Sequence, residues 1–446
     1  MADTRKKVII IGAAGRDFHN FNVFFKNSEE YDVVAFTANQ IPYISNRLYP
    51  KELSGPRYPN GIQIYDESKL EELIDELAVD ICVMAYSDLP YDTVMEKASK
   101  VNGAGADFWL LSPEHTMIKS KKPVVSVCGV RTGVGKSQTS RYVASFLKSE
   151  GLRVVVVRHP MPYGILKDQM VERFERLRDL DKYKTTIEER EDYEPHIRNG
   201  FVVYAGVDYE KILREAEKEA DVIIWDGGNN DTPFFKPDLA IAIADPLRAG
   251  NELTYYPGET VARTADVLII NKVNSASKEE VARVKRDLES INNRAVMVMA
   301  DSVVTPDNPK AMKGKRAVLV EDGPTITHGG MRFGAASVAA KEYGVGEVVN
   351  AKSYAVGSIK EVYEKYPGLG KELPAVGYST RQIKDLENTI NSIDCDIVVS
   401  ATPTNLRNVI TVNKPIVQIG YELRPIGGRF DSVLRSFAKK AIKERK

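Results

Sequence analysis

The sequence has few cysteines, few histidines and no long apolar run, and these absences exclude several classes of protein. Only three cysteines occur among 446 residues, and Cys82, Cys128 and Cys395 each lie in or beside an apolar, strand-like run. A disulfide scaffold is therefore excluded, and buried thiols in a reducing cytoplasm are expected. The five histidines are scattered without the spacing of a zinc site. No apolar run approaches the roughly 18 residues that span a membrane, and the N-terminus enters a strand directly instead of resembling a signal peptide.

The charges cancel, because 62 Lys and Arg residues face 62 Asp and Glu residues. Such a balance gives no strong attraction to nucleic acid or to an anionic membrane surface, so we expect neither as a partner. The hydrophobic fraction of 43% is ample for buried cores, and 446 residues predict two or three domains. Abundant charge with few Gln and Cys residues is also typical of thermophilic proteins.

Strand-like runs alternate with helical patterns almost throughout, which predicts an α/β fold with mainly parallel sheets. We expect three α/β units: a Rossmann-like domain over 1–119, a central P-loop NTPase domain over 120–345, and a C-terminal α/β domain over 346–446. The first glycine turn lacks the full dinucleotide-binding fingerprint, so the N-terminal unit is interpreted as a scaffold for the central one. The polar residues after its first strand, Arg16, Asp17 and His19, either bind a ligand or cap a helix.

The central unit opens with a nucleotide-binding loop. The apolar, β-branched run 124–127 is typical of a buried parallel strand, and CGVRTGVGKS (128–137) follows it before a helical stretch to about residue 150. A strand, a glycine-rich turn and a helix are the parts of a P-loop, whose N–H groups surround the phosphates of a nucleoside triphosphate. Lys136 is expected on the β- and γ-phosphates and Ser137 on Mg²⁺. The residues expected to hold the nucleotide here are Gly129, Thr132, Gly133, Val134, Gly135, Lys136, Ser137 and Gln138.

The loop departs from the standard P-loop consensus, because Val130 stands where a glycine is expected and Gly129 precedes it. This form resembles a deviant P-loop class that includes dethiobiotin synthetase, cobyrinate-type amidoligases and the septum-positioning ATPases. In part of that class a second lysine stands at the position of Arg131. The resemblance implies that Arg131 lies over the phosphates, in its own chain or across a homodimer, and takes part in catalysis.

A carboxylate is expected on the strand beside the loop. The apolar run 220–225 ends in Asp226, whose side chain would emerge beside Ser137 and hold Mg²⁺ directly or through water. In one interpretation Asp231, a second carboxylate within reach, shares the role of holding Mg²⁺. Glu259 is a further candidate for the metal or the substrate.

Residues 271–274 bear on which nucleotide is bound. Asn271, Lys272 and Asn274 resemble the N-K-x-D motif of GTPases, but the amide of Asn274 cannot accept both of the guanine hydrogen bonds that a carboxylate accepts. In dethiobiotin synthetase-like proteins an asparagine at the position of Asn271 meets the adenine base. ATP is therefore favoured, and GTP stays open as the alternative.

Cationic residues near the expected site are candidates for catalysis. Arg248 follows a strand, and the resemblance implies that it stabilises charge on the transferred phosphoryl group. Arg158 and His159 end the strand after the P-loop helix, where a guanidinium fork suits an anionic acceptor and an imidazole can move a proton. His328, in a turn rich in Thr and Gly, is a candidate general acid or base. The charged stretch 168–200 is long enough to form a lid, and the residues that we would test first there are Arg173, Glu194 and His196.

Several motifs together resemble an archaeal group of predicted GTPases related to cyclic 2,3-diphosphoglycerate synthetase. The motifs are 128–141, 225–231, 244–253, 255–259, 271–274 and 321–331. The resemblance implies an ATP-dependent phosphotransferase or ligase that closes an intramolecular phosphoanhydride on a small anionic phosphorylated acid. Two other classes stay open, a regulatory GTPase or metal-insertion chaperone and a non-catalytic nucleotide-binding scaffold.

Overall fold

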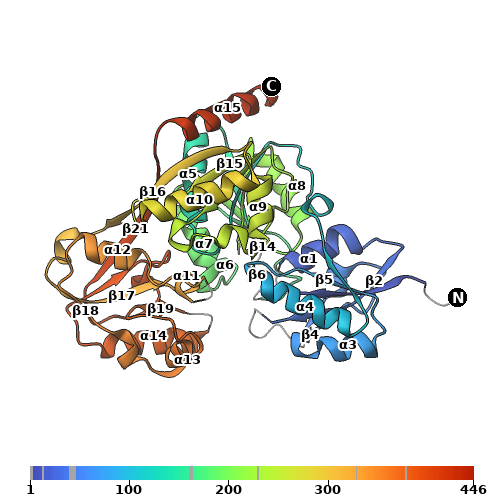
Figure 1. The fold of residues 1–446 in the computed structure, drawn as a ribbon, viewed down its shortest axis with the longest axis horizontal. Helices are drawn as coiled ribbons and strands as arrows, with labels where there is room; N and C mark the ends of the chain where they lie inside the picture. Colours follow the sequence, from blue (N-terminus) through green and yellow to red (C-terminus); the bar gives the residue numbers. More distant parts are fainter. Residues whose placement is uncertain are drawn as a thin grey trace.

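The chain alternates strands and helices from end to end and forms an α/β fold, as the sequence predicts. A computed structural model describes residues 4–12, 15–39, 47–159, 164–228, 231–327, 329–376 and 379–445. The two main sheets are one in the N-terminal part and a longer one that runs through the rest of the chain. In Figure 1 the blue N-terminal part and the orange C-terminal part lie on either side of the green and yellow centre.

The N-terminal sheet has six strands in the order β3-β4-β2-β1-β5-β7. All neighbours are parallel except β3 and β4. Helix α4 packs on β7 and on α3. The bounds are β1 Lys6–Ile11, β2 Tyr31–Ala38, β3 Leu48–Tyr49, β4 Ile62–Asp66, β5 Ile81–Met84, β7 Asp107–Leu110, α1 Arg16–Asn20, α2 Lys51–Ser54, α3 Leu70–Glu76 and α4 Tyr91–Gly103.

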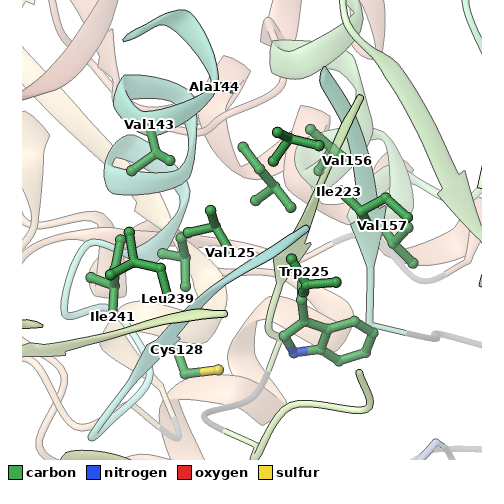
Figure 2. Packing of buried hydrophobic residues seen from close by; sticks show 14 of the residues in the cluster. Val125, Cys128, Val143, Ala144, Val156, Val157, Ile223, Trp225, Leu239 and Ile241 are labelled. Atoms are coloured by element: carbon green, nitrogen blue, oxygen red, sulfur yellow. The ribbon is translucent and has the colours of Figure 1, made fainter. Parts of the chain in front are cut away.

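The central strands run parallel in the order β11-β9-β12-β8-β13-β15-β16, with β10 antiparallel at the edge. Strands β8, β9 and β12 are buried along their whole length, which is why their sequences are continuous apolar runs. Figure 2 shows side chains from β8, β9, β12 and β13 gathered into one cluster with helix α5. The strands are β8 Val124–Gly129, β9 Val154–Arg158, β10 Glu172–Phe174, β11 Val202–Ala205, β12 Val222–Asp226, β13 Leu239–Ala244, β15 Val267–Ile270 and β16 Val296–Pro306. The helices are α5 Lys136–Ser149, α6 Leu177–Lys182, α7 Ile187–Arg198, α8 Tyr209–Glu219, α9 Gly258–Thr264 and α10 Lys278–Ile291.

The register of the central strands brings their carboxyl ends together. Asp226 lies opposite both Val127 and Arg158, and Ile243 lies opposite Gly129. The residues that follow β8, β9, β12 and β13 therefore meet at one edge of the sheet, where open α/β sheets bind their ligands.

The strands of the second sheet do not follow the division that the sequence predicted at residue 345. Strand β16 pairs antiparallel with β21, and the sheet continues through β20 to β17. Strand β17 precedes residue 345 but pairs with β18, β19 and β20, and helix α15 packs on α5 of the central part. The long strands β16 and β21 make this continuity possible. The bounds are β17 Arg316–Asp322, β18 Glu347–Val348, β19 Leu373–Ala375, β20 Ile397–Ser400, β21 Ile416–Pro425, α11 Gly323–Ile326, α12 Ala335–Glu342, α13 Gly357–Lys365, α14 Thr380–Ser392 and α15 Arg429–Glu444.

Polar side chains join the N-terminal part to the centre. The Arg16 guanidinium donates from Nε to both carboxylate oxygens of Asp231, at 2.9 and 3.0 Å. The His19 ring stacks on Phe234 with centroids 3.8 Å apart. Strands β6 (Leu89–Pro90) and β14 (Tyr255–Tyr256) form a short antiparallel pair across the same junction. The polar residues after the first strand thus hold two parts of the chain together.

The cysteines are free, with Cys82 and Cys128 buried and Cys395 half-buried. Burial raises the pKa of the Cys128 thiol to about 12, so this thiol stays protonated and acts as a small apolar side chain. Within the parts of the chain described above, no helix is both long and apolar enough to cross a membrane.

A buried pair of carboxyl groups predicts how stability depends on pH. Glu172 of β10 and Glu189 of α7 are both buried, and burial together with the charge of Glu189 raises the pKa of Glu172 to about 8. The folded protein therefore holds a proton that the unfolded chain releases above pH ~4.5, and stability falls as the pH rises from there to about 8. Glu172→Gln should raise the melting temperature by roughly 2 °C or more at about pH 9, with a smaller gain at about pH 5.

Differential scanning calorimetry across this pH range checks the prediction. Glu210→Gln, which removes an exposed carboxylate of α8, is the matched control and should leave the pH dependence unchanged. An equal effect of Glu172→Gln at both pH values would mean that Glu172 is ionised in the folded protein.

Candidate active site

The loop between β8 and α5 has the backbone of an anion-binding turn. Gly133 and Gly135 have φ of +76° and +109°, values that other residues rarely adopt. A Cβ atom at position 135 would lie 2.1 Å from the Asn271 amide nitrogen and 2.5 Å from that of Gln138. Helix α5 starts at Lys136, so its N-terminal N–H groups and positive dipole end face the loop. The local sequence was predicted to adopt this strand, loop and helix.

Three side chains donate hydrogen bonds to the backbone carbonyl groups of the loop. Arg248 donates to the Thr132 carbonyl oxygen at 2.7 Å, Lys272 to that of Gly133 at 2.6 Å, and Asn271 to that of Val134 at 2.9 Å. Three consecutive carbonyl groups are thereby held by side-chain donors. A loop whose carbonyl groups are fixed in this way is suited to present N–H groups to an anion.

A cavity of about 780 Å³ opens at this loop and reaches across to the C-terminal part. Its lining includes Thr132, Gly133, Gly135, Lys136, Ser137 and Gln138 of the loop region. Gly129 and Val134 are buried behind them. Burial lowers the pKa of the Lys136 ammonium to about 8, against the opposing charge of Asp88. An added phosphate would favour the charged form of this lysine.

Asp226 lies in a buried ionic network at the end of β12. Its carboxylate is 2.9 Å from a terminal nitrogen of Arg158 and 2.9 Å from Nε2 of His196. Burial alone would raise the pKa of Asp226, but Arg158 and His196 outweigh it and hold this pKa below its ordinary value. Arg158 also pairs with Asp192 of α7. The guanidinium that was expected to meet the acceptor therefore joins α7 to the expected metal carboxylate.

Arg131 points away from the loop that carries it. Its Nε donates to Asp88 at 2.6 Å, and its guanidinium carbon lies 3.6 Å from the centre of the Tyr255 ring. It also bonds Asn251. Asp88 of the N-terminal part holds the side chain outside the lining of the 780 Å³ cavity, so no described contact supports the expected position over the phosphates in the same chain. The arrangement across a homodimer stays a prediction.

Arg248 and Glu259 also lie differently from what was expected. Arg248 contacts the loop from behind, since it donates to the carbonyl oxygens of Thr132 and of Gly329, the latter at 2.5 Å. The carboxylate of Glu259 accepts from Tyr91 at 2.5 Å and from Arg263 at 2.8 Å. It is absent from the lining of the 780 Å³ cavity. Arg248 thus supports the loop, whereas Glu259 joins α9 to Tyr91 of α4.

The asparagines that were expected to read the base are occupied within the protein. Asn271 is fully buried and holds the Val134 carbonyl group. Asn274 exchanges two hydrogen bonds with the backbone of Ser302, at 3.0 and 3.1 Å. Lys272 pairs with Asp245 at 2.8 Å while it holds Gly133. The segment 271–274 thus stabilises the loop, and Ser275 and Ser302 line the cavity beside it.

This geometry predicts the effect of Asn271→Ala. The change leaves the Val134 carbonyl group without its buried donor, which costs about 1–3 kcal/mol and should weaken nucleotide binding by about tenfold or more. Because the contact is to the loop, ATP and GTP should lose affinity by the same factor. Calorimetric titration with both nucleotides is the measurement, and a changed ATP-to-GTP ratio would show that Asn271 contacts the base after all.

Of the two histidines that were expected to transfer protons, His159 lies within the described residues. Burial, aided by Arg158, lowers the pKa of His159 to about 3, so its ring is neutral near pH 7 and is a weak base. It still lines the cavity. His328 lies outside the described residues. In the stretch expected to form a lid, Arg173 pairs with Glu219 and Glu194 with Arg198, whereas His196 reaches Asp226.

Carboxylates line the same cavity in larger number than the sequence indicated. They are Asp88, Glu191, Asp192, Glu321 and Asp322. Burial raises the pKa of Asp322, and the charge of Asp192 raises it further. Asp88 lies in the segment between the end of β5 at Met84 and the start of β6 at Leu89, a position after a parallel strand that could have marked it as a ligand-facing residue. Asp192 lies inside a helix among many charges, and no local signal distinguishes it.

Comparison with known proteins places the chain among synthetases. No family model matches the chain. It is 56% identical over 448 aligned residues to arginine synthetase ArcE of Thermococcus kodakarensis, and the alignment spans 100% of both chains. The chain belongs to this synthetase family. It is therefore an enzyme, as its P-loop predicted.

The same family extends to the more distant relatives that the motifs indicated. Cyclic 2,3-diphosphoglycerate synthetase of Thermococcus sibiricus is 25% identical over 302 residues, which span 63% of this chain and 68% of that one. The protein of that name from Thermococcus kodakarensis is 25% identical over 262 residues, which span 53% and 59%. The expected resemblance to this archaeal group is confirmed.

Proposed function

We propose that this enzyme is an ATP-dependent synthetase whose product is arginine. The relative that matches over the whole chain bears that name, whereas the cyclic 2,3-diphosphoglycerate synthetases match over about half to two thirds. The match over the whole chain carries the proposal, and the carboxyl groups of the cavity support it. Five carboxyl groups line the space beside Lys136. Of these, Asp88 pairs with Arg131, Asp192 pairs with Arg158, and Glu321 accepts hydrogen bonds from backbone N–H groups.

The cationic side chains of the cavity leave little charge for a second polyanion. They are Lys136, Arg158, Lys272 and Lys365. Two of them are already paired, Arg158 with Asp192 and Asp226, and Lys272 with Asp245. A triphosphate alone would use the charge that Lys136 provides. A bisphosphorylated acid beside it would face carboxylates, and like charges at close range are strongly disfavoured.

A guanidinium suits the same carboxylates. Its planar N–H groups donate to carboxylate oxygens in pairs, and such charge-assisted bonds are about twice as strong as neutral ones. Asp192 and Asp322 lie close enough for the charge of one to raise the pKa of the other. A cation bound between them would relieve this repulsion, and Asp322 would then ionise more readily.

The proposed reaction proceeds in two balanced steps. The terminal carbonyl oxygen of a ureido amino acid attacks the γ-phosphorus of ATP, so that an O–P bond forms and the bond to ADP breaks. An amine then attacks the activated carbon, the C–O bond breaks, and one proton of the amine leaves with the phosphate. The products are the guanidinium amino acid, ADP and phosphate. The P-loop contributes by positioning the phosphates and stabilising their charge.

The site could hold Mg²⁺, although it offers the ion few protein ligands. The described residues contain no group of three or more His, Cys, Asp and Glu side chains that could hold a metal ion. Ser137 lines the cavity, while both oxygens of Asp226 are engaged by Arg158 and His196. Mg²⁺ bound through phosphates, water and one or two protein oxygens matches this pattern. When bound, the ion would neutralise phosphate charge.

A reconstituted assay tests the proposal. The purified protein is incubated with ATP, Mg²⁺, ammonium and citrulline, which is arginine with one terminal nitrogen replaced by oxygen. We expect arginine, ADP and phosphate in equal amounts by mass spectrometry and phosphorus NMR. A parallel reaction supplies 2,3-diphosphoglycerate in place of citrulline and ammonium. Formation of its cyclic anhydride, with no arginine in the first reaction, would reject the proposal in favour of the bisphosphate.

A further inference from the structure

A second cavity of about 660 Å³ adjoins the P-loop, and we propose that it binds a small phosphate-bearing anion that alters nucleotide affinity. Four arginines line it: Arg131, Arg248, Arg283 and Arg286. The first cavity contains neither Arg131 nor Arg248 in its lining. Proteins commonly bind phosphate with arginines that converge on one space, because each guanidinium group offers paired N–H donors.

Two of these arginines are buried, unlike ordinary surface cations. The side chain of Arg131 is 5% exposed and that of Arg248 is 9% exposed. The Nε atom of Arg248 is buried and has no hydrogen-bond partner within the described parts of the chain. A buried donor without an acceptor is costly.

Guanidinium groups outnumber carboxylates in the lining of this cavity, which has four arginines against Glu279 and Glu280. Outside the lining, Arg131 pairs with Asp88 and Arg248 with Asp245. Glu280 is already engaged, because it accepts from the Ser277 N–H at 2.9 Å as part of a helix cap. Arg283 pairs with Asp287 at 3.6 Å. The lining of this cavity thus differs from that of the first, which has more carboxyl groups.

The same arginines connect this cavity to the nucleotide site. Arg131 is part of the P-loop, and Arg248 holds the Thr132 carbonyl group of that loop. Both also donate to the Gly329 carbonyl oxygen, at 3.4 and 2.5 Å. An anion that draws either guanidinium toward itself changes the contacts that shape the loop. Binding at the two sites must then be coupled, and the coupling is reciprocal.

Titration calorimetry with inorganic phosphate and with pyrophosphate tests the site. The P-loop is first saturated with a non-hydrolysable ATP analogue and Mg²⁺, and ionic strength is held constant. The double variant R283Q/R286Q removes the two exposed guanidinium groups and leaves the buried pair in place. Lys285→Ala removes an exposed cation from the same helix outside the cavity and is the matched control.

We expect the wild type and Lys285→Ala to bind one equivalent of anion, and R283Q/R286Q to bind it about tenfold more weakly or worse. The affinity of the ATP analogue is then measured with and without phosphate. If phosphate changes this affinity by competing for the P-loop, the change persists in R283Q/R286Q. If phosphate acts from the second cavity, R283Q/R286Q loses the change. Anion binding that is absent, or equal in all three proteins, overturns the site. Binding that R283Q/R286Q loses without any effect on nucleotide affinity overturns the coupling.

Discussion

Lys136→Ala should reduce ATP-dependent turnover by about 10³-fold, the scale expected when a preorganised charge donor to the reacting group is lost. Lys136 is the first residue of α5 and lines the cavity beside the carboxylates that are proposed to bind the acceptor. Its ammonium has a pKa of about 8 because of burial, so a bound polyphosphate gains a charge partner in a poorly solvated place. The measurement is the initial rate of ADP formation at saturating ATP.

Lys148→Ala is the control for this prediction. Lys148 lies on the same helix, is exposed, and donates weakly to backbone carbonyl groups at 3.3 and 3.4 Å. Its replacement should leave turnover within about twofold, because surface changes of this kind rarely exceed 0.5 kcal/mol. Turnover by Lys136→Ala within about tenfold of wild type would place the triphosphate outside this loop.

Asp322→Asn should raise the KM for the amino acid acceptor, and the inhibition constant of arginine, by about 10- to 100-fold. One charge-assisted hydrogen bond to the bound side chain is lost, at about 1.5–3 kcal/mol. Asp322 caps α11 by accepting from the Thr325 N–H at 3.3 Å, and asparagine caps helices equally well. The fold should therefore persist, and the KM for ATP should change little.

Steady-state kinetics with each substrate varied in turn check this second prediction. Glu364→Gln removes an exposed carboxylate on α13 outside the cavity and should change neither KM. An Asp322→Asn enzyme whose KM rises for ATP and not for the amino acid would put the nucleotide, and not the acceptor, against this carboxylate.

The local elements of the site were predictable because their signals are local. A β-branched run, a glycine turn and a lysine–serine pair specify the strand, loop and helix that begin the P-loop. The apolar run that ends in Asp226 likewise places this carboxylate on the neighbouring strand, in register with Arg158. In each case the sequence spacing alone determines the geometry.

The side-chain directions were not predictable, because distant residues decide them. Arg131 turns toward Asp88, 43 residues earlier in the chain. Asn271 holds Val134, 137 residues away, in place of a base. Arg158 is captured by Asp192 from a helix whose charges resemble an ordinary solvated face. Each of these contacts depends on how the parts of the chain pack together, which periodicity does not report.

The proposed transfer of a phosphoryl group to the acceptor is tested most directly by oxygen labelling. Citrulline carrying ¹⁸O in its ureido group is converted with ATP and ammonium, and the products are read by phosphorus NMR and mass spectrometry. If the acceptor oxygen attacks the γ-phosphorus, each molecule of phosphate carries the labelled oxygen and ADP carries none. Unlabelled phosphate formed together with arginine, or label found in AMP, would contradict the mechanism that this cavity is proposed to support.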